Sequence, residues 1–213
     1  MAAPGKVTQG NGRKMHESSK SIFHKLNDSR YATRYLVGKG IDIGAGSDPL
    51  GQYGEFFPLM QSCRAWDLPD GDAEWMATVD DGAYDFVHSA HCLEHLADPD
   101  NALKNWVRIL KPGGHLVCIV PDEDLYEQGV FPSTYNADHK HTFTIYKERS
   151  WTETSINIVD LLYGILQPVQ IKKIELLDAT YRYSMSHPAS GKRFDQTLTP
   201  VGESAIEFIL KKL

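Results

Sequence analysis

Residues 40–50 read "GIDIGAGSDPL", a short apolar run that ends in Gly-x-Gly. A strand that leads into such a turn is typical of nucleotide-binding loops, because glycine allows the backbone to approach a ligand closely. A dinucleotide loop has a third glycine three residues further on, where this sequence has Pro49. A P-loop would continue with Gly-Lys-Ser/Thr, and this sequence does not. The stretch therefore predicts a nucleotide-type cofactor, argues against NAD and excludes a P-loop.

Apolar runs of strand length occur four times in the first part of the chain, at 40–44, 63–68, 84–89 and 115–121. Unbroken apolar runs are typical of strands that are covered on both faces of a sheet. Between the last two runs, residues 99–114 place apolar side chains on one helical face and end in Pro-Gly-Gly, a helix stop. Strands that alternate with helices predict βαβ units and a parallel sheet.

The rest of the chain completes one domain of 213 residues. We expect residues 1–20 to be a mobile polar tail, and residues 21–213 to form a single domain that begins with an amphipathic helix or helix pair at 20–36. Residues 122–149 are polar and aromatic, and are predicted to form a loop or lid on the substrate side. The later segments are predicted as a helix at 150–166, a flexible insertion at 184–202, and two strands at 169–181 and 205–213 that form an antiparallel edge.

Composition and charge indicate a globular, cytoplasmic protein. No apolar stretch reaches the roughly 20 residues of a membrane span, and the N-terminal segment lacks the apolar centre of a signal peptide. The net charge of -6 argues against a nucleic-acid-binding surface. Residues 42–100 contain 13 acidic residues and one basic residue, Arg64, so the loop region favours a cationic ligand over a pyrophosphate.

Four more segments follow the glycine loop in a recognisable order: "AWDLP" (65–69), "GDAE" (71–74), "YDFVHSAHCLEHL" (84–96) and "LKPGGHLVCIVPD" (110–122). With "GIDIGAGSDP" before them, residues 38–121 resemble class I S-adenosylmethionine-dependent methyltransferases of the small-molecule type. The resemblance implies a Rossmann-like, doubly wound, mostly parallel seven-stranded sheet with an antiparallel C-terminal edge strand and helices on both faces. It also implies S-adenosyl-L-methionine as the cofactor.

The resemblance assigns cofactor contacts residue by residue. Asp42, Gly44, Ala45 and Gly46 would form the loop under the methionine part of the cofactor, with Asp42 near its ammonium, directly or through water. Asp67 would bind the ribose hydroxyls and Leu68 would line the adenine, whose amine would contact Asp72 and Ala73. The remaining candidates are Ser89, beside the methionine, and Arg30 and Tyr31, for the cofactor carboxylate.

Methyl transfer to an alcohol needs a base that takes the hydroxyl proton, and histidine titrates close to neutrality. The segment "NADHKHTFT" (136–144) offers Asp138, His139 and His141, and an extended chain would place both histidines on one side. His91, at the start of the helix predicted after the third strand, is a further candidate that faces the site. Aromatic walls for an organic substrate are expected from Tyr126, Phe131, Tyr135 and Phe143.

His91-x-x-Glu94-His95 also matches a zinc-peptidase signature, in which two histidines on one helical face bind zinc. Because the pattern lies inside the methyltransferase motif order, we expect no metal site from it and keep a zinc hydrolase as a remote alternative.

The sequence thus predicts an enzyme that methylates a small polar acceptor, such as a hydroxyl of a sugar or related metabolite. The alternatives are an RNA methyltransferase, because residues 1–35 carry seven basic residues, and a non-catalytic nucleotide-binding protein with the same fold. Nucleic acid is the less favoured partner, no membrane is expected, and the oligomeric state is not predicted.

Overall fold

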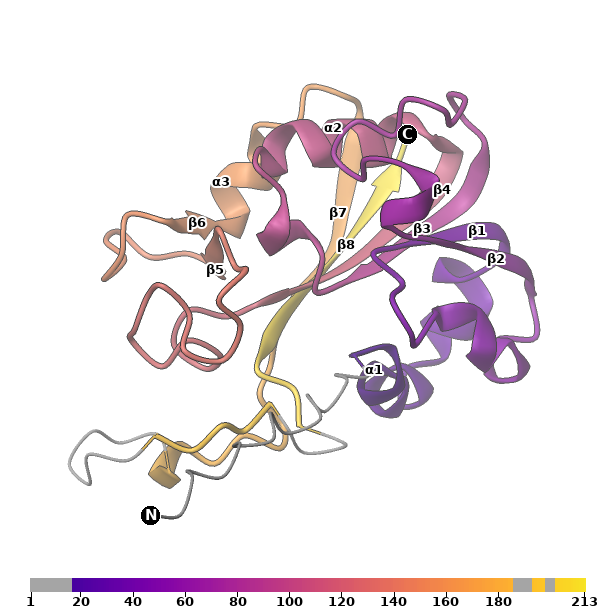
Figure 1. Ribbon diagram of the computed structural model, residues 1–213. Helices are drawn as coiled ribbons and strands as arrows, with labels where there is room; N and C mark the ends of the chain where they lie inside the picture. The colour runs from indigo at the N-terminus through magenta and orange to yellow at the C-terminus, as the bar shows by residue number, and fades with distance from the viewer. Residues whose placement is uncertain (1–16, 186–192, 198–201) are drawn as a thin grey trace, which may run out of the picture.

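The computed structural model describes residues 17–185, 193–197 and 202–213. A six-stranded sheet with the strand order β2-β1-β3-β4-β8-β7 forms its centre (Figure 1). The strands of this sheet are β1 (Gly38–Ile43), β2 (Met60–Trp66), β3 (Tyr84–Ala90), β4 (Leu110–Pro121), β7 (Val169–Leu177) and β8 (Ala205–Lys212).

Strands β1 to β4 pair in parallel, whereas β8 is antiparallel to both β4 and β7. The chain passes from β1 outward to β2 and then returns to β3 on the other side of β1. In a doubly wound sheet, ligands bind at such a reversal, outside the carboxyl ends of the strands. The Rossmann-like prediction is confirmed, but the described residues form six strands in this sheet, not seven.

Helices and short turns connect the strands. The α-helices are α1 (Glu17–Leu26), α2 (Pro99–Arg108) and α3 (Ile158–Tyr163). A π-helical turn, η1 (Tyr31–Tyr35), precedes β1. The 3₁₀ segments are η2 (Leu50–Phe56), η3 (Leu68–Asp70), η4 (Leu93–His95) and η5 (Tyr183–Met185), and β5 (Thr142–Thr144) pairs with β6 (Ser155–Asn157) in a small second sheet.

Two predicted helices are shorter than expected. The helix predicted at 99–114 ends at Arg108, and Pro-Gly-Gly lies inside β4, which begins at Leu110. Of the helix predicted at 150–166, only Ile158–Tyr163 is helical. Residues 155–157 pair instead with the lid strand β5, a long-range contact that the local sequence pattern does not contain.

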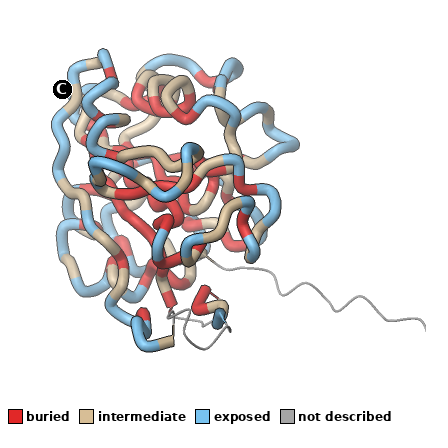
Figure 2. Tube along the Cα trace, turned by 90° about the vertical axis from the view of Figure 1, so that its left-hand side faces the viewer, coloured by how far each residue is buried: buried red, intermediate tan, exposed pale blue. Residues whose placement is uncertain are grey.

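The sheet is covered on both faces, and buried segments run through the middle of the molecule (Figure 2). Neighbouring residues of a strand point to opposite faces. Val87 accordingly packs into one core, together with Leu103 and Trp106 of α2. Phe86 packs into a second core, together with Ile22 of α1 and Tyr35. Both faces therefore carry an apolar core, as the unbroken strand sequences predict.

The N-terminal helix begins at Glu17, so residues 17–20 of the predicted tail are helical. Residues 1–16 of that tail, and 186–192 and 198–201 of the predicted insertion, lie outside the described residues. Within the described ranges, no helix has the length and apolar character to cross a membrane.

A buried carboxylate, Glu207 of β8, fixes α1 against the sheet. Its oxygens lie 3.1 Å from Nε2 of His24, 3.8 Å from Nζ of Lys25 and 3.0 Å from Nζ of Lys173. The hydroxyl of Tyr31 donates to the same carboxylate. Burial raises the pKa of Glu207, but the bonded His24 and the two lysines outweigh this effect and hold the pKa below its ordinary value.

We predict that Glu207→Gln lowers the free energy of unfolding by about 3–5 kcal/mol, because it leaves the ammonium of the buried Lys25 without its partner. Urea unfolding followed by tryptophan fluorescence measures this change. Glu175→Gln is the control, since Glu175 is half exposed, pairs with the same Lys173, and should cost less than about 1 kcal/mol. Equal, small losses in both variants would contradict the role of Glu207.

Candidate active site

The glycine loop leaves β1 at the point where the strand order reverses. Gly44 and Gly46 have φ of +75° and +54°, a left-handed conformation that favours glycine. The N–H groups of Gly44 and Ala45 donate to the carbonyl of Trp66 at the end of β2, at 2.9 and 3.2 Å. A Cβ on Gly44 would lie 2.5 Å from Cβ of Cys92. Backbone conformation and lack of space therefore both require glycine at position 44.

The carboxylate of Asp42 anchors this loop from below. Its Oδ2 accepts from the N–H of Leu50 at 2.7 Å, and its Oδ1 lies 2.6 Å from Nδ1 of His88 in β3. Both oxygens are thus occupied within the protein, although Asp42 also lines a cavity. The structure therefore gives Asp42 a loop-anchoring role and also places it in the wall of the acidic cavity, where its charge acts on a cationic ligand.

Two cavities open at the carboxyl edge of the sheet. The β2-side cavity, about 730 Å³, lies at the end of β2 and is lined by residues that include Trp66, Asp67, Leu68, Asp72 and Ala73. The acidic cavity, about 360 Å³, is lined by residues that include Glu17, Asp42, Asp48, Tyr126, His139 and Asp195. Gly44, Gly46, His91 and His95 line both cavities, so the two form one cleft across the glycine loop. Their volumes are in the range of small-molecule sites.

Six of the sequence-predicted cofactor residues line the β2-side cavity, namely Gly44, Gly46, Asp67, Leu68, Asp72 and Ala73, whereas Asp42 and Ala45 line the acidic cavity. Oδ1 of Asp67 accepts from the N–H of Leu68 at 2.8 Å and caps η3, and the Leu68 side chain is exposed at the cavity wall. Asp72 accepts from the N–H of Glu74, while the carbonyl of Ala73 accepts from Nε1 of Trp106. These bonds fix the backbone of two consecutive loops that face one ligand-sized space.

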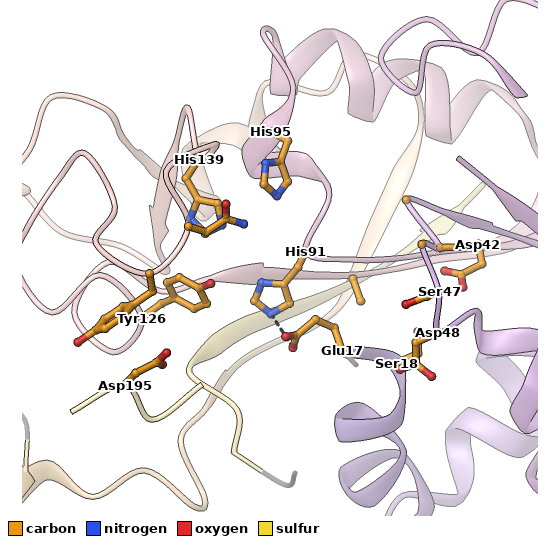
Figure 3. A pocket seen from close by; sticks show the side chains of 16 residues that line it. Glu17, Ser18, Asp42, Ser47, Asp48, His91, His95, Tyr126, His139 and Asp195 are labelled. Carbon is orange, nitrogen blue, oxygen red and sulfur yellow. Dashed lines mark ion pairs between the residues drawn. The ribbon is translucent and has the colours of Figure 1, made fainter. Parts of the chain in front are cut away.

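His91 lies at the centre of the cleft, between the glycine-loop side and the lid side (Figure 3). It follows β3 with φ of +54°, and its N–H donates to the carbonyl of Ile119 at 3.0 Å. Its Nε2 lies 3.6 Å from Glu17 and its Nδ1 lies 3.2 Å from Glu94. Burial lowers the pKa of His91, but these two carboxylates outweigh burial and leave the pKa above its ordinary value.

The lid places a second histidine in the acidic cavity. Nδ1 of His139 lies 2.7 Å from Oε1 of Glu127, and the imidazole is buried. The N–H groups of Lys140 and His141 both donate to the carbonyl of Glu94, at 2.9 and 3.2 Å, and so fix the lid against η4. Asp138, which is exposed, lies 3.0 Å from Nδ1 of His95 and lines the β2-side cavity.

Four sequence-predicted residues take no part in the cleft lining. Nε2 of His141 lies 3.4 Å from the carbonyl of Ala97, and this residue lines neither cavity. The buried hydroxyl of Ser89 donates to the carbonyl of Ile43 between β3 and β1. Arg30 pairs with Asp28, and the hydroxyl of Tyr31 donates to Glu207. Both residues lie outside the linings of the two cavities.

The aromatic predictions divide in the same way. Tyr126 and Tyr135 line the acidic cavity, whereas Phe143 is buried in the main core. Five acidic residues at the site were not predicted from the sequence: Glu17, assigned to the tail, Asp48, Glu74, Glu127, and Asp195, assigned to the insertion. Asp48 and Glu74 lie beside predicted site residues in the sequence, and Glu17 carries a local signal as an acidic residue in the first turn of an amphipathic helix. Glu127 and Asp195 reach the site through long-range folding.

The residues after β3 do not form the helix that a zinc-peptidase motif requires. His91 precedes η4, which covers only Leu93–His95. The two histidines therefore do not share a face of an α-helix, and the remote prediction of a zinc hydrolase built on that helix is not supported by the geometry.

Residues 30–154 match a protein-family model described as a methyltransferase domain. The match spans more than half of the chain and includes the glycine loop and the whole of the predicted lid, residues 122–149. The chain belongs to this methyltransferase domain family, and its fold is that of class I S-adenosylmethionine-dependent methyltransferases.

Two curated relatives match shorter segments. An uncharacterized methyltransferase of Schizosaccharomyces pombe is 38% identical over 58 residues, which cover 27% of this chain and 20% of the relative. An uncharacterized 37.1 kDa protein in transposon TN4556 of Streptomyces fradiae is 30% identical over 122 residues, covering 50% of this chain and 35% of the relative. The chain thus matches well under half of each relative's length.

Solved structures share the fold at low identity. A SAM-dependent methyltransferase from Archaeoglobus fulgidus superimposes with a TM-score of 0.51 at 16% identity, covering 91% of this chain and 94% of its own. A chain in the complex between the Haloferax volcanii Trm112 methyltransferase activator and a methyltransferase gives 0.51 at 15% identity, covering 92% and 90%. At these identities the likeness shows the fold alone.

We predict that Gly44→Ala destabilises the protein more than Gly113→Ala does. Both glycines have positive φ, of +75° and +84°, but a Cβ meets Cys92 only at position 44 and meets nothing within 4 Å at position 113. Backbone strain should cost each variant about 1–2 kcal/mol, and overpacking should add about 1–3 kcal/mol at Gly44. Chemical unfolding of both variants measures the difference, and equal losses would contradict the close packing of the loop.

Proposed function

We propose that the protein transfers a methyl group from S-adenosyl-L-methionine to a hydroxyl of a small polar acceptor, such as a sugar or related metabolite. The observation that carries the proposal is the single cleft, in which a ligand-sized space beside Asp67 meets an acidic space beside the lid at Gly44, Gly46 and His91. A transfer reaction needs two adjoining compartments of this kind, one for the donor and one for the acceptor.

The β2-side cavity fits the donor. Asp67 would accept hydrogen bonds from the ribose hydroxyls, while Leu68, Asp72 and Ala73 would enclose the adenine. The tight turn at Gly44 would bring the backbone close to the methionine part of the cofactor. Asp42 and Asp48 add negative charge on the far side of the loop, which favours a ligand that bears a sulfonium and an ammonium. The cofactor supplies an activated methyl group.

The residues of the cleft would then align the acceptor and take up its proton. Methyl transfer is an in-line displacement, so the position of the acceptor oxygen determines the rate. His91 lies at the junction of the two cavities and is the proposed proton acceptor. His139, held by Glu127, and Tyr126 would form the wall against which the acceptor lies.

The charge of the acidic cavity supports a small neutral or cationic acceptor. Its lining includes Glu17, Asp48 and Asp195, and no lysine or arginine among the described residues. Such a surface repels a phosphate backbone, which basic residues would need to neutralise. The fold shared with a chain from the Trm112 complex therefore does not favour an RNA acceptor for this protein. The non-catalytic alternative has its own test: calorimetry that finds no binding of S-adenosyl-L-methionine would favour it.

We expect Asp67→Ala to weaken binding of S-adenosylhomocysteine by roughly 10- to 150-fold, equivalent to about 1.5–3 kcal/mol, through loss of charge-assisted hydrogen bonds. Isothermal titration calorimetry measures the affinity. Asp67→Asn retains an oxygen for the cap on Leu68, and so separates loss of charge from loss of the turn. Asp81→Ala is the control, because Asp81 is an exposed acid outside the cavity lining. Wild-type affinity in both Asp67 variants would refute the ribose contact.

We expect His91→Asn to reduce methyl transfer by about 100-fold or more, because the proposed proton acceptor is lost. Asparagine is chosen because it tolerates the positive φ at this position. The assay follows radiolabelled methyl groups from the cofactor into a fractionated metabolite extract. His141→Ala is the matched control and should retain the wild-type rate within about twofold, since His141 turns away from the cleft. An active His91→Asn variant would remove His91 from the mechanism.

A further inference from the structure

The carboxylate of Glu94 is buried beside the acidic cavity, and its nearest polar neighbour is Nδ1 of His91, 3.2 Å from Oε1. The residue is 0% exposed, and within the described part of the chain neither Oε1 nor Oε2 accepts a hydrogen bond. A buried carboxylate in this condition is costly unless a cation neutralises it. The hydrogen bonds that fix the lid go to the backbone carbonyl of Glu94, so they do not relieve the side chain.

Besides His91, two further imidazoles present nitrogens to this carboxylate. Nε2 of His139 lies 3.8 Å from Oε1 of Glu94, and Nε2 of His95 lies 4.0 Å from the same oxygen. The other nitrogen of each ring is occupied by a carboxylate, since Nδ1 of His139 lies 2.7 Å from Glu127 and Nδ1 of His95 lies 3.0 Å from Asp138. Histidines that bind metals are commonly oriented in this way by a carboxylate on the second nitrogen.

We propose that Glu94, His95 and His139 bind a divalent transition-metal ion of the zinc class. Their three ligand atoms lie within 4.8 Å of one another. A tetrahedral centre with bonds of about 2.1 Å separates its ligands by roughly 3.4 Å, so adjustments of the order of an ångström would bring the three atoms onto one ion. Two imidazoles and one carboxylate favour such a metal over Mg²⁺, which prefers oxygen ligands and retained water.

The position of this site differs from that of the zinc-peptidase motif. Glu94 and His95 come from η4, whereas the third ligand, His139, comes from the lid. The N–H groups of Lys140 and His141 join these two segments through the carbonyl of Glu94. His91 remains outside the three-ligand set and has Glu17 near its Nε2. A metal ion would therefore strengthen a contact between lid and η4 that the backbone already makes.

A three-ligand site leaves a coordination position open. His95 and His139 both line the acidic cavity, so this position would face the space assigned to the acceptor. An acceptor hydroxyl oxygen bound there would be held at a fixed place in the cleft. This last step rests on the proposed function, whereas the metal site itself rests only on the geometry of Glu94 and the two imidazoles.

Cobalt binding tests the site directly. The full chain, stripped with a chelator and dialysed, is titrated with Co²⁺, whose visible absorption reports a low-coordinate site with nitrogen ligands. The wild type and the His141→Ala control should bind one equivalent with the same affinity. Glu94→Gln and His139→Ala should each bind at least about 100-fold more weakly. Glu94→Gln keeps the side-chain shape and removes the buried charge, so it is expected to fold even if His139→Ala does not, and circular dichroism of the metal-free proteins checks this.

Absence of Co²⁺ absorption in the wild type, or wild-type affinity in Glu94→Gln, would overturn the metal site. Calorimetry with S-adenosylhomocysteine on the metal-free protein separates the two proposals. Intact S-adenosylhomocysteine binding without Co²⁺ binding refutes the metal site alone. Co²⁺ binding without S-adenosylhomocysteine binding refutes the proposed cofactor and leaves the metal site standing.

Discussion

The buried carboxylate of Asp42 is the constraint on which the cleft depends. It joins the N–H of Leu50, after the glycine loop, to the imidazole of His88 in β3. The loop is thereby held over the carboxyl ends of β1 and β3, where the strand order reverses and the sheet edge stays open. Without this anchor, the turn at Gly44 would not be held against Cys92, and the two cavities would lose their shared wall.

Acidic residues are concentrated around the glycine loop both in the sequence and in the folded structure. In the sequence, acidic residues concentrate between positions 42 and 100, and in the fold the acidic cavity adds Glu17 from α1 and Asp195 from near the C-terminus. Among the described residues that line the acidic cavity, the side chains that can carry a positive charge are three histidines, His91, His95 and His139. Such a site suits ligands that are cationic or rich in hydroxyl groups, and the carboxylate–imidazole pairs among the buried residues are the chemistry from which a metal site can be built.

Local sequence predicted which loops line the β2-side cavity, because these are short loops that directly follow strands. Gly44, Asp67, Asp72 and Ala73 all line one cleft, in positions that βαβ connectivity dictates once the strands are recognised. The lid half was predicted less well. His139 and His141 lie two residues apart, yet only His139 lines the acidic cavity, where Glu127 holds it, whereas Nε2 of His141 lies 3.4 Å from the carbonyl of Ala97.

The sequence by itself determined the methyltransferase fold and the place of the glycine loop, since apolar periodicity and turn residues act over a few positions. Only the tertiary structure decided which polar groups are paired. The hydroxyl of Ser89 donates to the carbonyl of Ile43, and the hydroxyl of Tyr31 donates to Glu207. Glu94 is buried beside imidazoles from η4 and the lid. Hydrogen bonds and ion pairs of this kind join residues far apart in the chain, so their partners are fixed by packing and cannot be read from local pattern.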